Sequence, residues 1–173
     1  KSLDEIGGMA GLKKWLDLRK PAFEPHGEAY GLQAPRGILL AGLPGSGKSL
    51  AASVVANIFE VPLLRFSFGA LLTRWFGESE RNLQVAMRQI ERFAPCVLWI
   101  DEIEKVFRKT VASTDETTSR MLADVLTWLQ DRKETVFVVA TVNELTKLPA
   151  ELTRRGRFDV TFFVDLPTAN ERE

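Results

Sequence analysis

The octet GLPGSGKS, at Gly42–Ser49, is the feature that most constrains how this chain folds. It matches the pattern G-x-x-x-x-G-K-[ST], whose glycines leave backbone N–H groups free to surround a phosphate. Such a loop lies between a strand and a helix, because the helix N-terminus points at the same anion. The sequence provides both, since the apolar run GILLA ends at Ala41 and a helical pattern covers Lys48–Phe59. The octet therefore predicts a phosphate-binding loop at one edge of a sheet.

The side chains of the loop have different expected roles. Lys48 would reach the β- and γ-phosphates of a nucleotide, and the Ser49 hydroxyl would ligate Mg²⁺. The other predicted nucleotide contacts come from the same stretch, at Pro44, Gly45, Ser46, Gly47 and Leu50.

Short apolar runs alternate with longer helical patterns along the whole chain. This alternation predicts an α/β fold, a three-layer sandwich with a five-stranded parallel sheet and helices on both faces. Together with the glycine loop, such a sandwich is similar to the P-loop NTPase fold. The central runs are almost wholly apolar, as strands buried on both faces should be. The expected strands are Gly37–Ala41, Pro62–Phe66, Cys96–Ile100, Val136–Thr141 and Thr161–Val164, and the expected helices are Leu12–Arg19, Lys48–Phe59, Ser79–Phe93, Thr118–Gln130 and a short one near Ala150–Thr153. The polar stretch Lys109–Ser119 is the best candidate for a mobile loop.

Polar side chains follow two of these strands at their carboxyl ends. Asp101 and Glu102 come directly after VLWI, and Asn143 follows the fourth expected strand. Ligands bind at this edge of a parallel sheet. Asp101 would hold Mg²⁺ through water, and Glu102 would activate or orient the attacking water. The amide of Asn143 would orient the same water or touch the γ-phosphate. The alternatives are that the acidic pair caps a helix and that Asn143 is only a turn residue.

Composition excludes several classes of protein. The 23 basic and 23 acidic residues balance, so no overall field favours nucleic acid or an anionic membrane, although a local basic patch stays open. No apolar run approaches the ~18 residues of a membrane span. His26 is the single histidine and reads as a surface loop residue, which nearly excludes Ser-His-Asp catalysis and histidine metal sites. Cys96 reads as a core residue.

Taken together, these motifs resemble the AAA+ ATPases, and within them the AAA clade. The wording of GKSL, PCVLWIDEIEK and ATVNELTKLPAEL is similar to AAA proteins of cyanobacteria and plastids. The segment WFGESE is similar to that of katanin, spastin and other protein remodellers. The resemblance covers essentially the whole chain in the family's order, through DEIGG (Asp4–Gly8), GLPGSGKS, WFGESE, APCVLWIDEIEKVF (Ala94–Phe107), Asn143 and RRGRFD (Arg154–Asp159).

The resemblance implies further roles. Arg154 and Arg157 would be arginine fingers that act on the neighbouring subunit's nucleotide, so the active site would need an oligomer, usually a homo-hexamer. Arg155 stands where many relatives have proline, so which of Arg154 and Arg157 is the dominant finger stays open. Glu104 replaces a common aspartate. The backbone of Ile6, Gly7 and Gly8 would contact adenine, and Trp75, Phe76 and Gly77 would form a pore loop that grips substrate.

The two aromatic residues of WFGESE have a second interpretation as a hydrophobic staple packed on the core. Gly77 favours the exposed loop, because it gives the turn the freedom to present Trp75 and Phe76 outward. Ser79 can cap the helix that follows, which would leave the aromatics before its start.

The chain begins at Lys1 without a methionine and ends where the family's small helical lid would begin. We therefore expect residues 1–173 to be the AAA+ large (nucleotide-binding) subdomain of a longer protein, monomeric and weak in hydrolysis without its lid. The favoured function is protein remodelling driven by Mg·ATP; a regulatory assembly switch and a nucleic-acid motor are the alternatives. Glu102 argues against a module that only binds nucleotide, and the zero net charge argues against nucleic acid, although aromatics can stack on bases. The expected location is the cytoplasm, or the plastid stroma for a plastid-encoded chain.

Overall fold

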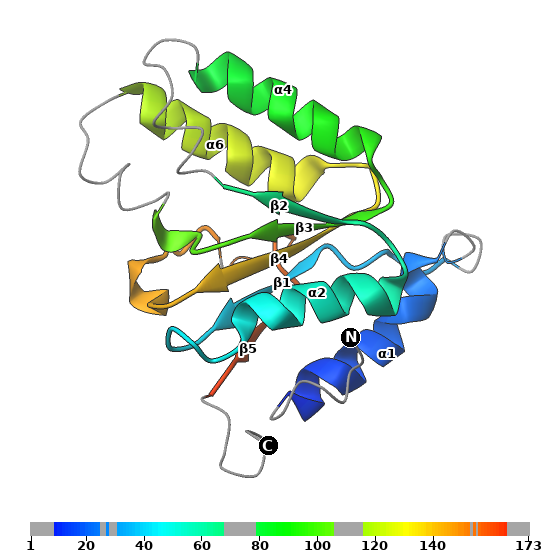
Figure 1. Cartoon of the computed structure of the whole chain (residues 1–173). Coiled ribbons are helices and arrows are strands. Elements are labelled where there is room, and N and C mark those ends of the chain that lie inside the picture. The colour runs from blue at the N-terminus through cyan, green and yellow to red at the C-terminus, as the bar shows by residue number, and fades with distance from the viewer. Residues whose placement is uncertain are drawn as a thin grey trace.

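A sheet of five parallel strands forms the centre of the described part of the chain (Figure 1). The structure is a computed structural model and describes residues 9–24, 27, 31–67, 79–105, 116–152, 154 and 156–165. The strand order across the sheet is β2-β3-β4-β1-β5. The strands are β1 (Gly37–Ala41), β2 (Leu63–Phe66), β3 (Cys96–Ile100), β4 (Val136–Val142) and β5 (Val160–Phe163). The predicted five-stranded parallel sheet is confirmed.

Helices cover both faces of this sheet, as Figure 1 shows. Helices α1 (Ala10–Phe23) and α2 (Lys48–Phe59) lie on one face, and α4 (Ser79–Arg92) and α6 (Glu116–Asp131) lie on the other. Each pair packs on its own buried apolar cluster. The three-layer α/β sandwich is therefore confirmed. No helix in the described ranges is long and apolar enough to cross a bilayer.

Two interior strands of the sheet, β1 and β4, are buried along their whole length. Successive residues point to opposite faces, so Leu39 belongs to the cluster under α4 and α6 while Leu40 belongs to the cluster under α1 and α2. Phe137 anchors the second cluster, with its ring centroid 5.0 Å from that of Phe59. Burial on both faces explains why these strands read as continuous apolar runs.

Helix α1 continues beyond the predicted end at Arg19, through Pro21 to Phe23. Proline usually ends a helix because it removes a hydrogen bond. Here the last turn buries Ala22 and Phe23, and the Phe23 ring stacks on Phe59 with 4.4 Å between centroids. Apolar burial therefore outweighs the local preference.

Three other local predictions need correction. The short helix expected near Ala150–Thr153 is wrong where the structure describes it, because residues 150–152 form turns and a 3-10 helix, η3 (Leu145–Lys147), precedes them. Of the loop expected at Lys109–Ser119, residues 116–119 belong to α6 and the rest lie outside the described ranges. Strand β5 also begins and ends one residue earlier than expected.

Candidate nucleotide-binding site

The glycine loop joins β1 directly to α2, as its motif predicts. Gly45 and Gly47 have φ angles of 82° and 92°, in the left-handed region that favours glycine. A Cβ atom at Gly42 would lie 2.1 Å from the carbonyl oxygen of Val164, so no larger residue fits there. At Gly45 a Cβ would meet nothing within 4 Å, which leaves open space beside the backbone. The loop is thus a glycine-lined cradle at the N-terminus of a helix.

Lys48 folds over this cradle. Its side chain is only 7% exposed, and Nζ donates hydrogen bonds of 2.7 Å to the carbonyl oxygens of both Gly42 and Leu43. Burial lowers the pKa of the Lys48 ammonium below its usual value, and the nearby Glu104 carboxylate opposes that shift. The Ser46 hydroxyl is buried and has no hydrogen-bond partner within the described ranges.

The acidic pair after β3 is held by a threonine from β4. The Thr141 hydroxyl donates to Asp101 Oδ1 at 2.7 Å and accepts the backbone N–H of Glu102 at 2.9 Å. Glu102 has a φ of 49°, an uncommon conformation for a residue with a side chain. Strain of this kind persists only where the surroundings fix the backbone, and Thr141 supplies that constraint.

Asn143 lies beside Glu102. Its Nδ2 donates to Glu102 Oε1 at 3.2 Å, and its backbone N–H donates to Glu104 Oε1 at 3.0 Å. Glu104 is only 4% exposed, so its carboxylate is a buried anchor. The other carboxylate oxygen of Glu102 forms an ion pair with Lys105.

These groups line one pocket of about 460 Å³ at the C-terminal edge of the sheet. That volume is in the usual range for a small-molecule site. The lining combines the glycine cradle with the acidic pair and the amide, in Pro44, Gly45, Gly47, Lys48, Ser49, Asp101, Glu102 and Asn143. Three separate segments of the predicted site are therefore brought together around one pocket.

Comparison with known proteins gives the family. The family model for the ATPase family associated with various cellular activities (AAA) matches residues 38–166. This chain is a member of the AAA family. The uncharacterized AAA domain-containing protein ycf46 of Gracilaria tenuistipitata var. liui is 44% identical over 173 residues, 99% of this chain and 35% of that protein. The ycf46 protein of Guillardia theta is 45% identical over 172 residues, 99% of this chain and 34% of that protein.

A more distant relative is the uncharacterized AAA domain-containing protein C16E9.10c of Schizosaccharomyces pombe, which is 32% identical over 182 residues, 99% of this chain and 23% of that protein. The chain thus spans about a third or less of the relatives that it matches. The ycf46 relatives confirm the resemblance to plastid AAA proteins that the sequence predicted.

The two arginines expected to act as fingers, Arg154 and Arg157, do not line this pocket. Arg154 is exposed, and Arg157 is half-buried and donates through Nη1 to the Glu151 carbonyl oxygen. Ile6, Gly7 and Gly8, Trp75, Phe76 and Gly77, and Arg155 lie outside the described residues. The adenine contact, the pore loop and the fingers therefore stay predictions.

The sequence did not indicate two residues that contact the acidic pair of the AAA domain. Thr141 holds both Asp101 and Glu102, and Arg65 forms an ion pair with Asp101. The available signals were a hydroxyl within the apolar strand VFVVATV and one charge within the short strand LLRF. Neither signal indicates which residue Thr141 or Arg65 contacts, because both contacts are made to residues that follow a neighbouring strand, β3.

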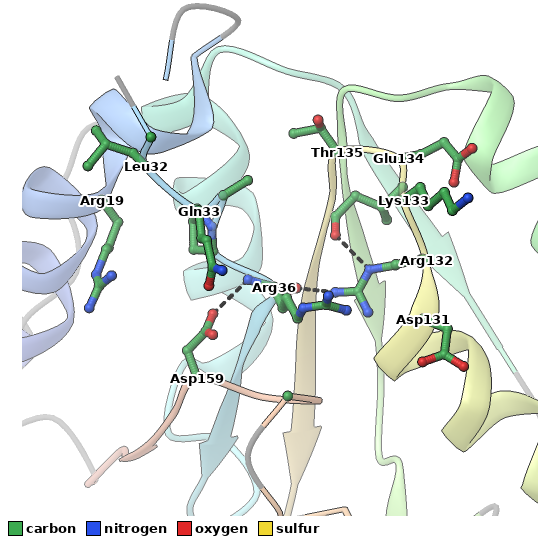
Figure 2. Close-up of a pocket in the computed structure, with 15 residues that line it drawn as sticks. Arg19, Leu32, Gln33, Arg36, Asp131, Arg132, Lys133, Glu134, Thr135 and Asp159 are labelled. Atoms are coloured by element: carbon green, nitrogen blue, oxygen red, sulfur yellow. Dashed lines mark hydrogen bonds between the residues drawn. The ribbon is translucent and has the colours of Figure 1, made fainter. Parts of the chain in front are cut away.

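A larger pocket of about 740 Å³ lies at the opposite edge of the sheet (Figure 2). Two of its polar side chains, those of Arg132 and Asp159, bond to backbone atoms at or next to the starts of the strands. The Arg132 guanidinium donates to the carbonyl oxygens of Val136, at 3.0 Å, and of Arg36, while Asp159 accepts the backbone N–H groups of Arg36 and Gly37. Burial lowers the pKa of Arg132 to about 10, which leaves it charged at neutral pH. This pocket therefore reads as a structural junction between the starts of β1, β4 and β5.

Proposed function

We propose that this AAA domain binds and hydrolyses Mg·ATP in the pocket at the C-terminal edge. The observation that carries the proposal is the convergence of Lys48, Asp101, Glu102 and Asn143 on one pocket beside the glycine cradle. A P-loop ATPase needs a phosphate cradle, a metal ligand and a group that activates water. The pocket contains a candidate for each.

The residues present fit a nucleotide polyphosphate with its metal. The cradle leaves space beside Gly45, and the Ser46 hydroxyl is a buried polar group without a protein partner in the described ranges. Lys48 would exchange its two carbonyl contacts for phosphate oxygens. Ser49 and Asp101 would hold Mg²⁺, which is usually bound by one or two protein groups together with substrate phosphates. The bound metal would neutralise charge on the β- and γ-phosphates.

The catalytic step falls to Glu102. Its carboxylate would take a proton from the attacking water or orient that water. Asn143 would fix the carboxylate through the hydrogen bond to Oε1. Thr141 would keep Asp101 and the Glu102 backbone at a set distance from each other.

At the level of the whole protein, we propose that residues 1–173 form the AAA large subdomain of a homo-hexamer that remodels a protein substrate. Arg154 and Arg157 would complete the neighbouring subunit's site, and Trp75, Phe76 and Gly77 would contact the substrate. Membership of the AAA family supports an oligomer of this kind. Stimulation of the full-length ATPase by an unfolded peptide would support remodelling; stimulation by single-stranded nucleic acid would favour the motor, and no response would favour an assembly switch.

The nucleotide site is tested by thermal unfolding with and without Mg·ADP or Mg·ATP. A ligand at 100 times its Kd stabilises the folded state by about 2.7 kcal/mol, so the melting temperature of the unaltered chain should rise. Lys48→Ala should abolish the rise, whereas Lys133→Ala, an exposed lysine in the pocket at the opposite edge, should keep it. An equal rise in Lys48→Ala and in the unaltered chain would contradict the site.

A further inference from the structure

Arg65 occupies an unusual position at the edge of the sheet. It is the charged residue of β2, an edge strand, and it pairs in register with Trp99 on β3. Its guanidinium carbon lies 4.5 Å from the centroid of the Trp99 ring. Stacking on an aromatic face holds a guanidinium in a defined place while leaving it open to water.

From this position Arg65 reaches the carboxylate proposed to hold the metal. Its Nη2 lies 3.2 Å from Asp101 Oδ2, while the Thr141 hydroxyl donates to Oδ1 at 2.7 Å. Both oxygens of Asp101 therefore have a protein donor. Thr141 is neutral and compatible with a nearby metal, but Arg65 brings a full positive charge to the same carboxylate.

We propose that Arg65 sets the Mg²⁺ affinity of the site by competing with the metal for Asp101. This inference rests on the proposed Mg·nucleotide site. A guanidinium and a divalent cation that share one carboxylate repel each other, so binding of the metal requires Arg65 to withdraw. The Arg65 side chain is 63% exposed and that of Asp101 is 31% exposed, so water can solvate the guanidinium as it leaves. Arg65 thus lowers the affinity for Mg²⁺ without closing the site.

Trp99 gives the exchange a signal that does not depend on activity. The guanidinium lies over its ring, so withdrawal of Arg65 changes the surroundings of the indole. We expect the tryptophan fluorescence to change when Mg²⁺ is added to the nucleotide-bound protein. The fluorescence change that comes from Trp99 should be absent from Trp99→Phe and from Arg65→Gln.

The experiment is a MgCl2 titration of the full-length protein at a fixed, saturating ADP concentration, followed by melting temperature and by tryptophan fluorescence. Arg65→Gln should lower the Mg²⁺ midpoint about 2–5-fold, the range that an exposed ion pair provides. Arg65→Lys keeps the positive charge, so its Mg²⁺ midpoint should stay closer to that of the unaltered protein. Arg19→Gln is the matched control, because Arg19 is also exposed and lies 5.4 Å from a tryptophan ring, that of Trp15, away from the acidic pair.

An unchanged or higher midpoint in Arg65→Gln, in a protein that still responds to Mg·ADP, would overturn the role of Arg65 and leave the nucleotide site standing. An equal decrease of the Mg²⁺ midpoint in Arg19→Gln would also overturn it. The decrease would then come from the loss of any positive charge and not from the contact between Arg65 and Asp101. If the unaltered protein shows no response to Mg·ADP at all, both this inference and the proposed function fail.

Discussion

The side-chain amide of Asn143 lies 3.2 Å from the carboxylate of Glu102 and donates a hydrogen bond to Oε1. The two residues follow neighbouring strands, β4 and β3, and meet at the C-terminal edge of the sheet. The backbone N–H of Asn143 is in turn held by the buried carboxylate of Glu104. Because the backbone of Asn143 is held in place, its side-chain amide can keep the Glu102 carboxylate in one orientation. A carboxylate that activates water has to be positioned in this way.

Asn143→Ala should therefore slow hydrolysis more than it weakens binding. We expect kcat to fall about 10²-fold, since removal of one positioned hydrogen-bond donor from a catalytic centre costs about that much or more. The nucleotide Kd should change little. Steady-state ATPase of the full-length protein and nucleotide titration measure the two quantities. Asn82→Ala, an exposed asparagine on α4, is the control. A large loss of affinity in Asn143→Ala would contradict an orienting role.

Thr141→Val keeps the volume of a fully buried side chain but removes its hydroxyl. The Glu102 N–H would lose its acceptor and Asp101 would lose a donor. We expect the free energy of unfolding to decrease by about 1–3 kcal/mol, the cost of an unsatisfied buried polar group. Urea unfolding measures this difference. Thr141→Ser retains the hydroxyl, so its free energy of unfolding should lie closer to that of the unaltered chain. Equal decreases in Thr141→Val and Thr141→Ser would mean that the hydrogen bonds do not contribute and that only packing matters.

Several site residues could be predicted because their signal is local. The glycines of the octet Gly42–Ser49 determine the backbone conformation of the loop that contains Lys48. A polar residue that directly follows a buried parallel strand lies at the carboxyl edge of the sheet. That rule placed Asp101, Glu102 and Asn143 at one edge without knowledge of the strand order.

The contacts of Arg65 and Thr141 could not be predicted in the same way. Arg65 meets Asp101 only because β2 lies beside β3 with Arg65 opposite Trp99. Thr141 meets the acidic pair only because β4 lies between β3 and β1, an arrangement that chain order alone does not give. The end of α1 could not be predicted for a related reason, since the burial of Phe23 against Phe59 overrides the local effect of Pro21.

The proposed arginine fingers predict activity that depends on assembly. If Arg154 and Arg157 act on a neighbouring subunit, the specific activity of the full-length protein should rise with its concentration. Arginine fingers contribute ~10³–10⁵ in rate in related chemistry. Subunits with Arg154→Ala and Arg157→Ala should therefore inhibit unaltered subunits when the two are mixed. Activity that is independent of concentration, in a protein that sediments as a monomer, would contradict action between subunits.

The buried thiol of Cys96 predicts a loss of stability at alkaline pH. Burial raises the pKa of Cys96 to about 11, against about 8.5 in an unfolded chain. Between these values the unfolded chain releases the proton and the folded chain keeps it, so the free energy of unfolding falls as pH rises. The slope from this group approaches 1.4 kcal/mol per pH unit. Urea unfolding at several pH values measures it. Cys96→Ala should lack this contribution, and identical slopes in the two proteins would contradict the prediction.

The two interpretations of Trp75 make opposite predictions. Trp75 lies outside the described residues, so the exposed pore loop remains a prediction. If the loop is exposed, Trp75→Ala should leave the melting temperature and nucleotide binding nearly unchanged. In the full-length protein it should abolish the stimulation of ATPase by substrate.

A tryptophan packed on the core behaves differently, because its truncation costs ~3–5 kcal/mol of stability. Trp128 provides the internal control: it packs on the core under α4 and α6, and its Nε1 donates to Glu91 Oε1 at 2.7 Å. Trp128→Ala should therefore destabilise the domain clearly in the same thermal unfolding assay. A loss of stability in Trp75→Ala comparable to that in Trp128→Ala would show that Trp75 is packed as a staple, and the pore loop would have to be abandoned.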